Sequence, residues 1–264
     1  MSRMDLNGKK VWLTGASSGI GAALARVLHA RGAWLCLVAR RRDRMESLRR
    51  ELSEPDRVVI EPADLSDEAE RIRLWEQSSA RHGCPDVWVH NAGIAQRAKA
   101  RDADLASVRR IMEINFFAPV HLTRLSLPAM VERGSGHLAI VSSVVGYVST
   151  PRRSTYAASK HALHGWFEAV RAEEKTHGIG VTMVCPGYVR TEVGAHALRA
   201  DGRPQGSAAR EKGMDPGLCA ERIVRALEKG RPEIHVGGPE IGGIWVRRFA
   251  PGLFRWLAPR MVPR

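Results

Sequence analysis

The sequence predicts an α/β protein in which helices cover both faces of a doubly wound, mostly parallel sheet of seven strands. Short apolar runs alternate along the chain with longer segments whose apolar residues recur at helical spacing. Several runs are apolar without alternation, as expected of strands buried on both faces of a parallel sheet. A glycine-rich turn joins the first run to the first helical segment, which is the strand–turn–helix unit of such sheets.

The composition favours one domain in a reducing compartment. A chain of 264 residues with 44% hydrophobic content can bury one large core. We expect this domain over residues 1–238 and a distinct tail over residues 239–264. The four cysteines show neither paired nor metal-ligand spacing, so we expect no disulfide and no metal site. The polar N-terminus and the lack of an apolar run of about 18 residues predict neither a signal peptide nor a transmembrane helix, and hence a cytoplasmic protein.

The formal net charge of +13 favours polyanions such as nucleic acid, lipid headgroups or a phosphorylated cofactor. The basic residues are spread through every segment, alternate with acids on the predicted helices and form no basic–aromatic recognition motif. We therefore expect no nucleic-acid partner.

The first predicted strand spans residues 9–14 and the first helix residues 22–31, with the glycine turn between them. Gly15 permits the tight turn, Gly19 lets the backbone approach a pyrophosphate, and Gly21 lets the helix pack close to the strand. The helix N-terminus then presents free N–H groups to the anion. Glycines also mark ordinary turns, but the flanking strand and helix favour a dinucleotide site. Its predicted contacts are Gly15, Ser17, Ser18, Gly19, Ile20 and Gly21.

The second strand, residues 33–39, ends in three arginines. In a dinucleotide-binding fold, an acid at this strand end binds the ribose 2′-hydroxyl, whereas an arginine suits a 2′-phosphate. No acid is present, and Arg40 and Arg41 offer planar guanidinium groups that match a phosphate. The sequence thus favours NADP(H) over NAD(H). Arg42 and Arg44 are more simply explained as the solvated face of the next helix.

The third and fourth strands, residues 57–60 and 86–90, end on the carboxyl edge of the sheet, where open α/β sheets bind ligands. Asp64 is expected either to accept a hydrogen bond from an adenine amino group or to cap the next helix, residues 67–81. The predicted cofactor contacts after these strands are Asp64, Leu65, Asn91, Ala92 and Gly93.

A long helix is expected from Asp102 or Asp104 to residue 133. Asn115 lies in an apolar stretch near its middle, where a buried asparagine needs polar partners. Pro119 and Pro128 indicate that the helix is bent or broken, which is one way for Asn115 to face a site.

The fifth strand, residues 137–141, leads into the stretch 142–160, where we expect the chemistry. Tyr156 and Lys160 are one helical turn apart, so their side chains point the same way. Lowering a tyrosine pKa to about 7 requires roughly 4 kcal/mol, which one buried cation and a positively charged cofactor ring can supply. Ser143 would donate a second hydrogen bond to the same substrate oxygen. Taken alone, such a tyrosine–lysine pair is usually a surface pair worth a few tenths of a kcal/mol.

The sixth strand, residues 180–185, precedes Pro186 and Gly187, and a helix at 216–229 precedes the seventh strand at 233–236. Residues 188–213 show the least periodicity and are expected to form the substrate loop. The end of the chain, residues 241–264, mixes aromatic side chains with arginines. We expect this segment to lie on a membrane surface or, alternatively, to pack on its own domain or across a subunit interface.

Several short motifs follow one another along the chain in this order: Thr14-Gly15-x-x-x-Gly19-Ile20-Gly21, Asn91-Ala92-Gly93, Asn115, Ser143, Tyr156-x-x-x-Lys160 and Pro186-Gly187. Together they resemble the short-chain dehydrogenase/reductase family over about residues 7–236. The resemblance implies a Rossmann-like fold and a catalytic tetrad of Asn115, Ser143, Tyr156 and Lys160. It also implies cofactor contacts at Tyr156, Lys160, Pro186, Gly187, Val189 and Thr191.

In a tetrad of this kind, Tyr156 is the acid/base and Ser143 orients the substrate oxygen. Lys160 holds the nicotinamide ribose and lowers the tyrosine pKa, and Asn115 holds a water that links the lysine to solvent. Two positions depart from the usual pattern. His90 replaces the first asparagine of Asn-Asn-Ala-Gly, which we expect to affect packing only. Ser18 stands where some NADP(H)-preferring relatives carry a basic residue, so the preference depends on the Arg40 region.

The resemblance implies an NADP(H)-dependent oxidoreductase that moves a hydride between nicotinamide and a carbonyl or secondary alcohol carbon. Apolar residues near the site favour reduction of a hydrophobic ketone or aldehyde, with substrate contacts at Ser143, Val145 and Tyr188. The family also implies a homodimer or homotetramer. The alternatives are a dinucleotide-sensing protein without turnover and a membrane-surface binder.

Overall fold

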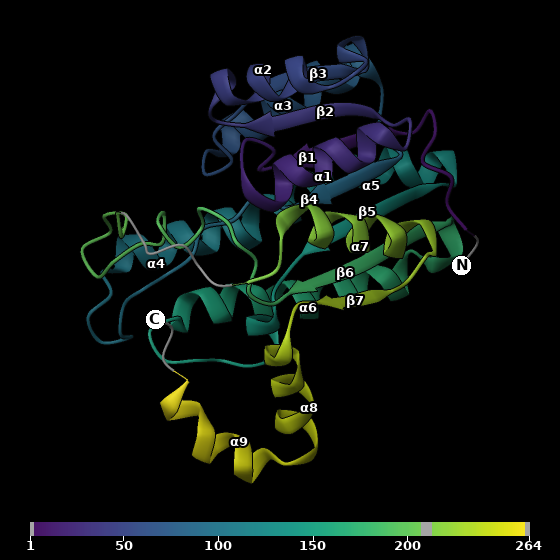
Figure 1. The fold of residues 1–264 in the computed structure, drawn as a ribbon. Coiled ribbons are helices and arrows are strands. Elements are labelled where there is room, and N and C mark those ends of the chain that lie inside the picture. Colours follow the sequence, from purple (N-terminus) through teal and green to yellow (C-terminus); the bar gives the residue numbers. More distant parts are fainter. Residues whose placement is uncertain (1–2, 207–212, 262–264) are drawn as a thin grey trace.

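A single seven-stranded sheet forms the centre of the protein. The computed structural model describes residues 3–206 and 213–261. All neighbouring strands run parallel in the order β3-β2-β1-β4-β5-β6-β7 (Figure 1), which confirms the predicted α/β fold. The strands are β1 Lys10–Thr14, β2 Trp34–Ala39, β3 Val58–Pro62, β4 Val87–His90, β5 Gly136–Val141, β6 Ile179–Pro186 and β7 Glu233–Val236.

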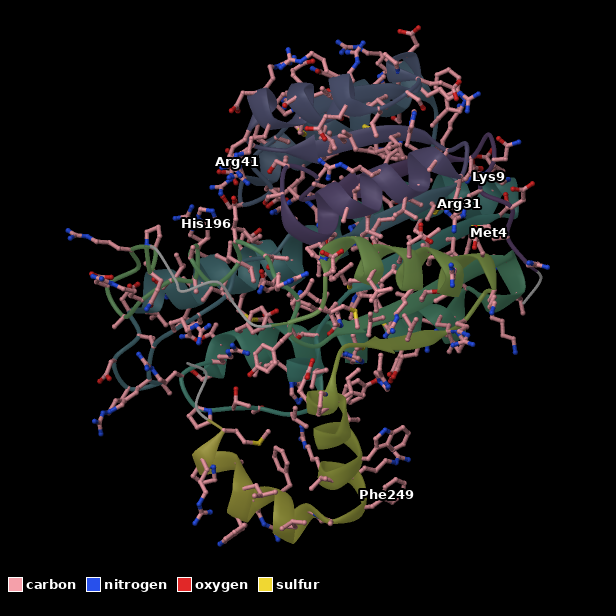
Figure 2. All side chains as sticks on the ribbon, in the orientation of Figure 1. Met4, Lys9, Arg31, Arg41, His196 and Phe249 are labelled. Carbon is pink, nitrogen blue, oxygen red and sulfur yellow. The ribbon has the colours of Figure 1, made fainter. Side chains whose placement is uncertain are left out.

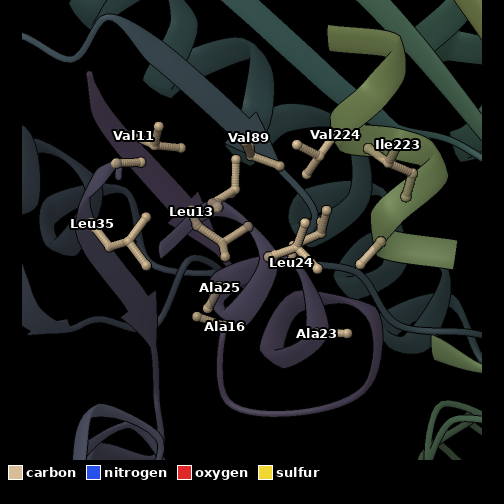
Figure 3. Close-up of a cluster of buried hydrophobic side chains, with 14 of the residues drawn as sticks. Val11, Leu13, Ala16, Ala23, Leu24, Ala25, Leu35, Val89, Ile223 and Val224 are labelled. Atoms are coloured by element: carbon tan, nitrogen blue, oxygen red, sulfur yellow. The ribbon is translucent and has the colours of Figure 1, made fainter. Parts of the chain in front are cut away.

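Helices cover both faces of this sheet. The main helices are α1 Gly19–Ala30, α2 Arg42–Glu51, α3 Glu68–His82, α4 Leu105–Met112, α5 Ala118–Arg133, α6 Ser154–Glu173 and α7 Pro216–Glu228. Leu24 of α1 and Ile223 of α7 pack on one face, beside Leu13 of β1 (Figure 3). Leu122 of α5 and Phe167 of α6 belong to the buried cluster on the other face. Burying both faces explains why the strands are apolar without alternation.

The strand order reverses between β1 and β4, and the carboxyl ends of these two strands are joined by hydrogen bonds. The Thr14 hydroxyl accepts a hydrogen bond from the backbone N–H of Asn91 and another from that of Ala92, each at 3.0 Å. Open α/β sheets bind ligands at such a reversal, outside the carboxyl ends of the strands. The topology therefore places the glycine turn and residues 91–93 at one ligand-binding edge.

The long helix expected around Asn115 is continuous, but its winding changes there. A π-helical turn, Glu113–Phe117, separates α4 from α5. Pro119 lies in the first turn of α5 and Pro128 lies inside this helix, and each lacks the backbone N–H that would donate to the preceding turn. Single π turns inside helices are frequent at functional sites. Asn115 thus lies in the wider π-helical turn.

His90, at the end of β4, is a buried packing residue. Its ring stacks on Trp88 with centroids 5.1 Å apart, and its Nε2 lies 3.0 Å from the Thr123 hydroxyl oxygen. Burial lowers the pKa of His90 to about 3, so the ring is neutral near pH 7.

The chain after β7 forms a short helical turn, Pro239–Ile241, and two helices, α8 Gly242–Phe249 and α9 Pro251–Leu257 (yellow in Figure 1). Ile244 is buried against Val144 and Val148, so this tail packs in part on its own domain. Within the described ranges, no helix has the length and apolar character needed to cross a membrane.

The expected substrate loop is only partly described. Isolated bridges connect Val189 with Met214, and Leu198 with both Gln96 and Pro204. Residues 207–212 of the expected loop lie outside the described residues.

Candidate active site

A cavity of about 450 Å³ opens at the carboxyl edge of the sheet and brings together most of the predicted site residues. This volume lies within the usual range for small-molecule sites. The predicted cofactor residues that line it are Gly15, Ser17, Ser18, Gly19, Ile20, Gly21, Arg40, Arg41, Asp64, Leu65, Asn91, Ala92, Gly93, Tyr156, Lys160, Pro186, Gly187, Val189 and Thr191. Ser143 and Tyr188 line it as well.

The glycine turn forms a cradle that side chains would fill. Gly15 has φ +68°, and a Cβ there would lie 2.8 Å from the Cα of Ala92. A Cβ on Gly21 would collide with the backbone oxygen of Gly15. The Asn91 side-chain amide donates to the backbone oxygens of Thr14 and Gly15, at 3.0 and 3.3 Å, and so holds the turn against β4.

The first turn of α1 has free backbone donors. Its N-cap residue, Ser18, makes no side-chain capping hydrogen bond. The unsatisfied N–H groups and the positive end of the helix dipole favour an anion at this position. The turn therefore fits the pyrophosphate of a dinucleotide.

Arg41 lies beside this turn, at the end of β2. Its Nη2 donates to the hydroxyl oxygens of Ser17 and Ser18, at 3.1 and 3.0 Å. Burial, followed by the charge of Arg44, lowers the pKa of the Arg41 guanidinium, a penalty that a bound anion would offset. Figure 2 labels Arg41 and, on the loop segment below it, His196; both line the cavity.

Asp64 lines the cavity and does not cap α3. Its Oδ1 accepts hydrogen bonds from the Ser66 backbone N–H and hydroxyl, at 3.0 and 2.8 Å. Burial alone would raise the pKa of this carboxyl, but the two hydrogen bonds, together with the charges of Arg40 and Arg110, outweigh burial and lower the pKa. Asp67 caps the helix instead, because its side chain accepts from the backbone N–H of Ala69 and that of Glu70.

Lys160 is a buried cation next to the predicted acid/base. Its side chain is 3% exposed, and its Nζ donates to the backbone oxygen of Val141 at 2.8 Å. The same Nζ lies 5.7 Å from the ring centre of Tyr156. Burial lowers the pKa of Lys160 to about 8, so most of the lysine is charged at pH 7.

Asn115 lies behind the cavity wall and not in it. Its Oδ1 accepts from the Ile94 N–H at 2.8 Å, and its Nδ2 donates to the Ile94 carbonyl and to the Ser159 hydroxyl, both at 3.0 Å. A Cβ at Gly93 would lie 3.3 Å from this Oδ1 and 3.6 Å from Nζ of Lys160. Glycine therefore leaves open the space between the amide oxygen and the ammonium, which is where a bridging water would lie.

Ser143 is placed at the end of β5 with its hydroxyl engaged in the protein. Its Oγ donates to the Pro186 carbonyl at 3.3 Å and accepts from the Val145 N–H at 3.2 Å. Val145 is buried in the turn Val144–Gly146 and does not line the cavity. The lining of this cavity therefore gives no support to the predicted substrate contact of Val145.

A buried polar cluster joins His164 of α6 to the segment that follows β5. The Ser142 hydroxyl oxygen lies 2.9 Å from Nε2 of His164. The Tyr147 hydroxyl donates to Glu233 at 2.6 Å. Burial lowers the pKa of His164 to about 4, so the cluster has a neutral imidazole.

The sequence analysis did not name several lining residues, although some adjoin predicted site residues in the chain and others belong to the predicted substrate loop 188–213. They are Ala39, Ala63, Ile94, Ala95, Arg97, Ile114, Val141, Ser142, Arg153, Glu192, Val193, Gly194 and His196. Arg153 lies in the stretch 142–160 where the chemistry is expected, three positions before Tyr156.

Chemically, the cavity can bind a dinucleotide at the glycine turn and a small molecule near Tyr156. It combines a buried cation, a phenol and a serine hydroxyl, the groups needed to move a proton to or from a substrate oxygen.

Comparisons with known proteins agree with this architecture. The family model for short chain dehydrogenase matches residues 9–201. A protein from Danio rerio, dehydrogenase/reductase SDR family member 7B, is 38% identical over 272 aligned residues, which cover 98% of this chain and 87% of its own.

Solved structures resemble the whole fold. A short-chain dehydrogenase from Streptomyces avermitilis matches with a TM-score of 0.81 at 30% identity, over 95% of this chain and 96% of its own. A metagenomic short-chain oxidoreductase in complex with NADP matches with a TM-score of 0.73 at 28% identity, over 88% and 98%. A neighbour in complex with NAD is also found. The chain therefore belongs to the short-chain dehydrogenase/reductase family of oxidoreductases.

Proposed function

We propose that the protein is an NADP(H)-dependent reductase of hydrophobic ketones or aldehydes. The observation that carries the proposal is the shared cavity. Tyr156, Lys160 and Ser143 line the same space as the glycine turn at the start of α1. A dinucleotide whose pyrophosphate binds at the glycine turn would thus extend along the cavity toward the phenol of Tyr156.

The tetrad residues take complementary parts. In the reducing direction, Tyr156 donates its phenolic proton to the carbonyl oxygen as the hydride adds to the carbonyl carbon, which gives an alcohol. The nicotinamide, when bound, supplies the hydride. Ser143 donates a hydrogen bond to the same oxygen, exchanging its contact with the Pro186 carbonyl for the substrate. The Lys160 ammonium favours the tyrosinate that remains.

Asn115 positions the lysine and its surroundings. Its amide ties the backbone of Ile94 to the hydroxyl of Ser159, one residue before Lys160. One lone pair of Oδ1 remains for a water beside Nζ, in the space that Gly93 leaves open. Such a water would return a proton to the site after each turnover.

The NADP(H) preference is supported by the end of β2. Ala39 provides no carboxylate to bind a ribose 2′-hydroxyl, and Arg41 lies against the glycine turn. Its guanidinium can exchange the two serine hydroxyls for a phosphate, which is the better acceptor. Solved structures with this fold hold NADP or NADPH in some cases and NAD in another, so the preference is proposed from these residues.

The experiment that tests the proposed function compares wild type with Tyr156→Phe. We expect the variant to lose turnover of NADPH with a ketone panel while it still quenches or enhances NADPH fluorescence on binding. Loss of one phenolic oxygen removes the proton donor and leaves the cradle intact. Unchanged turnover in the variant would remove Tyr156 from the mechanism.

A second function is favoured by the exposure of the tail, and we propose that α8 and α9 rest on an anionic membrane surface. Trp245, Phe249 and Trp256 are 52%, 74% and 60% exposed. Phe249 lies at the outer edge of the tail (Figure 2). Residues 241–264 contain several arginines and no acid, which suits anionic headgroups and disfavours contact with a second copy of the same face.

The tail proposal is tested with vesicles that contain phosphatidylglycerol and with neutral vesicles. We expect Trp245→Ser with Trp256→Ser to weaken binding to the anionic vesicles at least tenfold. Trp34→Ser is the matched control, since Trp34 is 47% exposed but lies on β2. Equal binding by all three proteins would end the membrane proposal.

We also propose a cytoplasmic homodimer or homotetramer, as is common in the family. Sedimentation equilibrium of the full chain measures the assembly, and a monomer at micromolar concentration would contradict it.

A further inference from the structure

Arg153 is a basic residue at the substrate end of the cavity. It is the N-cap residue of α6 and lines the same cavity as Tyr156, three positions along the chain. Both side chains therefore reach one space. The Arg153 guanidinium carbon lies 5.7 Å from the ring centre of Tyr188, another lining residue.

The acidic side chains that line the cavity bind residues other than Arg153. Asp64 and Glu192 are its acidic lining residues among those the structure describes. Asp64 bonds to Ser66, and Glu192 pairs with Arg44 at 2.8 Å. Across residues 3–206 and 213–261, no carboxylate forms an ion pair with Arg153. A partly buried guanidinium without a carboxylate is unusual, since charges removed from water are normally paired.

The backbone around Arg153 is held in an unusual conformation. Arg152 has φ +64°, the one non-glycine residue with a positive φ in the described part of the chain. Such a conformation is unfavourable for a residue with a Cβ and persists only where neighbours impose it. Here the Ala98 N–H donates to the Arg152 carbonyl, and Gln96 Oε1 accepts from the Thr155 N–H. These contacts hold the backbone on both sides of Arg153.

We propose that Arg153 binds an anionic group of the substrate, so that the protein reduces carbonyl compounds bearing a carboxylate or a phosphate. The inference rests on the proposed function and narrows its substrate class. The planar guanidinium matches two oxygens of either anion. Arg97 lines the same cavity. Apolar neighbours such as Ile94 and Val193 suit the rest of an amphiphilic substrate.

The test compares matched pairs of ketones in NADPH oxidation: levulinate and longer keto acids, each beside its methyl ester, and hydroxyacetone phosphate beside hydroxyacetone. We expect kcat/KM for the better anion to exceed that of its neutral partner at least tenfold. Arg153→Gln should abolish the difference by raising KM for the anion while leaving the neutral compound unchanged. Arg153→Lys should retain part of it.

Arg152→Asn is the control, because it removes the neighbouring charge and asparagine tolerates positive φ. Binding is also measured without turnover, by titrating the preferred anion into the complex with NADP⁺ in a calorimeter. Loss of this binding in Arg153→Gln alone supports the proposal. Equal rates for anionic and neutral ketones, together with unchanged binding in that variant, overturn it and leave the reductase function intact. Absence of any NADPH oxidation would instead overturn the proposed function, and the calorimetric comparison would still decide the role of Arg153.

Discussion

Replacing Lys160 with methionine should abolish activity at every pH but change the free energy of unfolding only at high pH. The lysine is almost completely buried, and burial lowers its pKa from 10.5 to about 8. Each pKa unit corresponds to about 1.4 kcal/mol, so keeping the charge at pH 7 costs the folded state about 3 kcal/mol. Methionine removes this cost but leaves the Val141 carbonyl without its donor, a loss of about 1–3 kcal/mol. We therefore expect similar stabilities near pH 7.

The two proteins should separate as the pH rises. Between pH 8 and pH 10.5 the unfolded wild-type chain keeps a proton on Lys160 that the folded chain has released. The free energy of unfolding of wild type therefore rises with pH in this window, and that of the variant lacks this contribution. Relative to Lys160→Met, wild type should gain about 3 kcal/mol from pH 7 to pH 10.5.

Urea denaturation at several pH values measures this difference directly, because the other titrating groups are common to both proteins. The m-values should agree, so that a change in midpoint reports stability alone. Parallel stability curves from pH 7 to pH 10.5 would refute the reasoning, since they would mean that Lys160 titrates as an ordinary lysine. The variant should lack NADPH oxidation at every pH.

Three further predictions concern the cofactor, the water site and the acid limit of stability. The double variant Arg40→Asp with Arg41→Ala should reverse the ratio of kcat/KM for NADPH and NADH, because it replaces a partner for the 2′-phosphate by a partner for the 2′-hydroxyl. An unchanged ratio would mean that other residues bind the 2′-phosphate. Gly93→Ala should lower kcat tenfold or more with near-normal stability, since its Cβ enters the space between Asn115 and Lys160, and full activity would argue against a bridging water there. His90→Leu should reduce the acid sensitivity of folding. The pKa of His90 is about 3 in the folded protein, so wild type should lose about 2 kcal/mol more than the variant from pH 7 to pH 5, as measured by urea denaturation. Equal losses of stability in the two proteins would mean that His90 takes up a proton as readily in the folded state as in the unfolded state.

Local patterns in the sequence predict the sheet and the cofactor end of the cavity well. The apolar runs correspond to strands because burial on both faces leaves few polar positions. The glycine turn is equally local, since Gly15 and Gly21 are required by the short distances between β1, α1 and Ala92. Boundaries are less accurate: α1 begins at Gly19, three residues before the predicted start.

The substrate end was harder to predict because it is assembled from distant segments. Arg97 and Arg153 lie more than fifty residues apart in the sequence and become neighbours through the pairing of Ala98 with Arg153. No periodicity reports such a contact. The burial of Val145 likewise depends on a tight turn that follows β5 and not on the hydrophobicity of the residue.

The central claim, that this cavity transfers a hydride to a carbonyl carbon, is tested most directly with NADPH deuterated at C4 of the nicotinamide. Wild type and a reducible ketone are incubated with each C4 epimer, and the alcohol is examined by mass spectrometry. We predict one deuterium on the carbinol carbon from one epimer, none from the other, and no alcohol with Tyr156→Phe. Alcohol that carries no deuterium from either epimer would contradict the account.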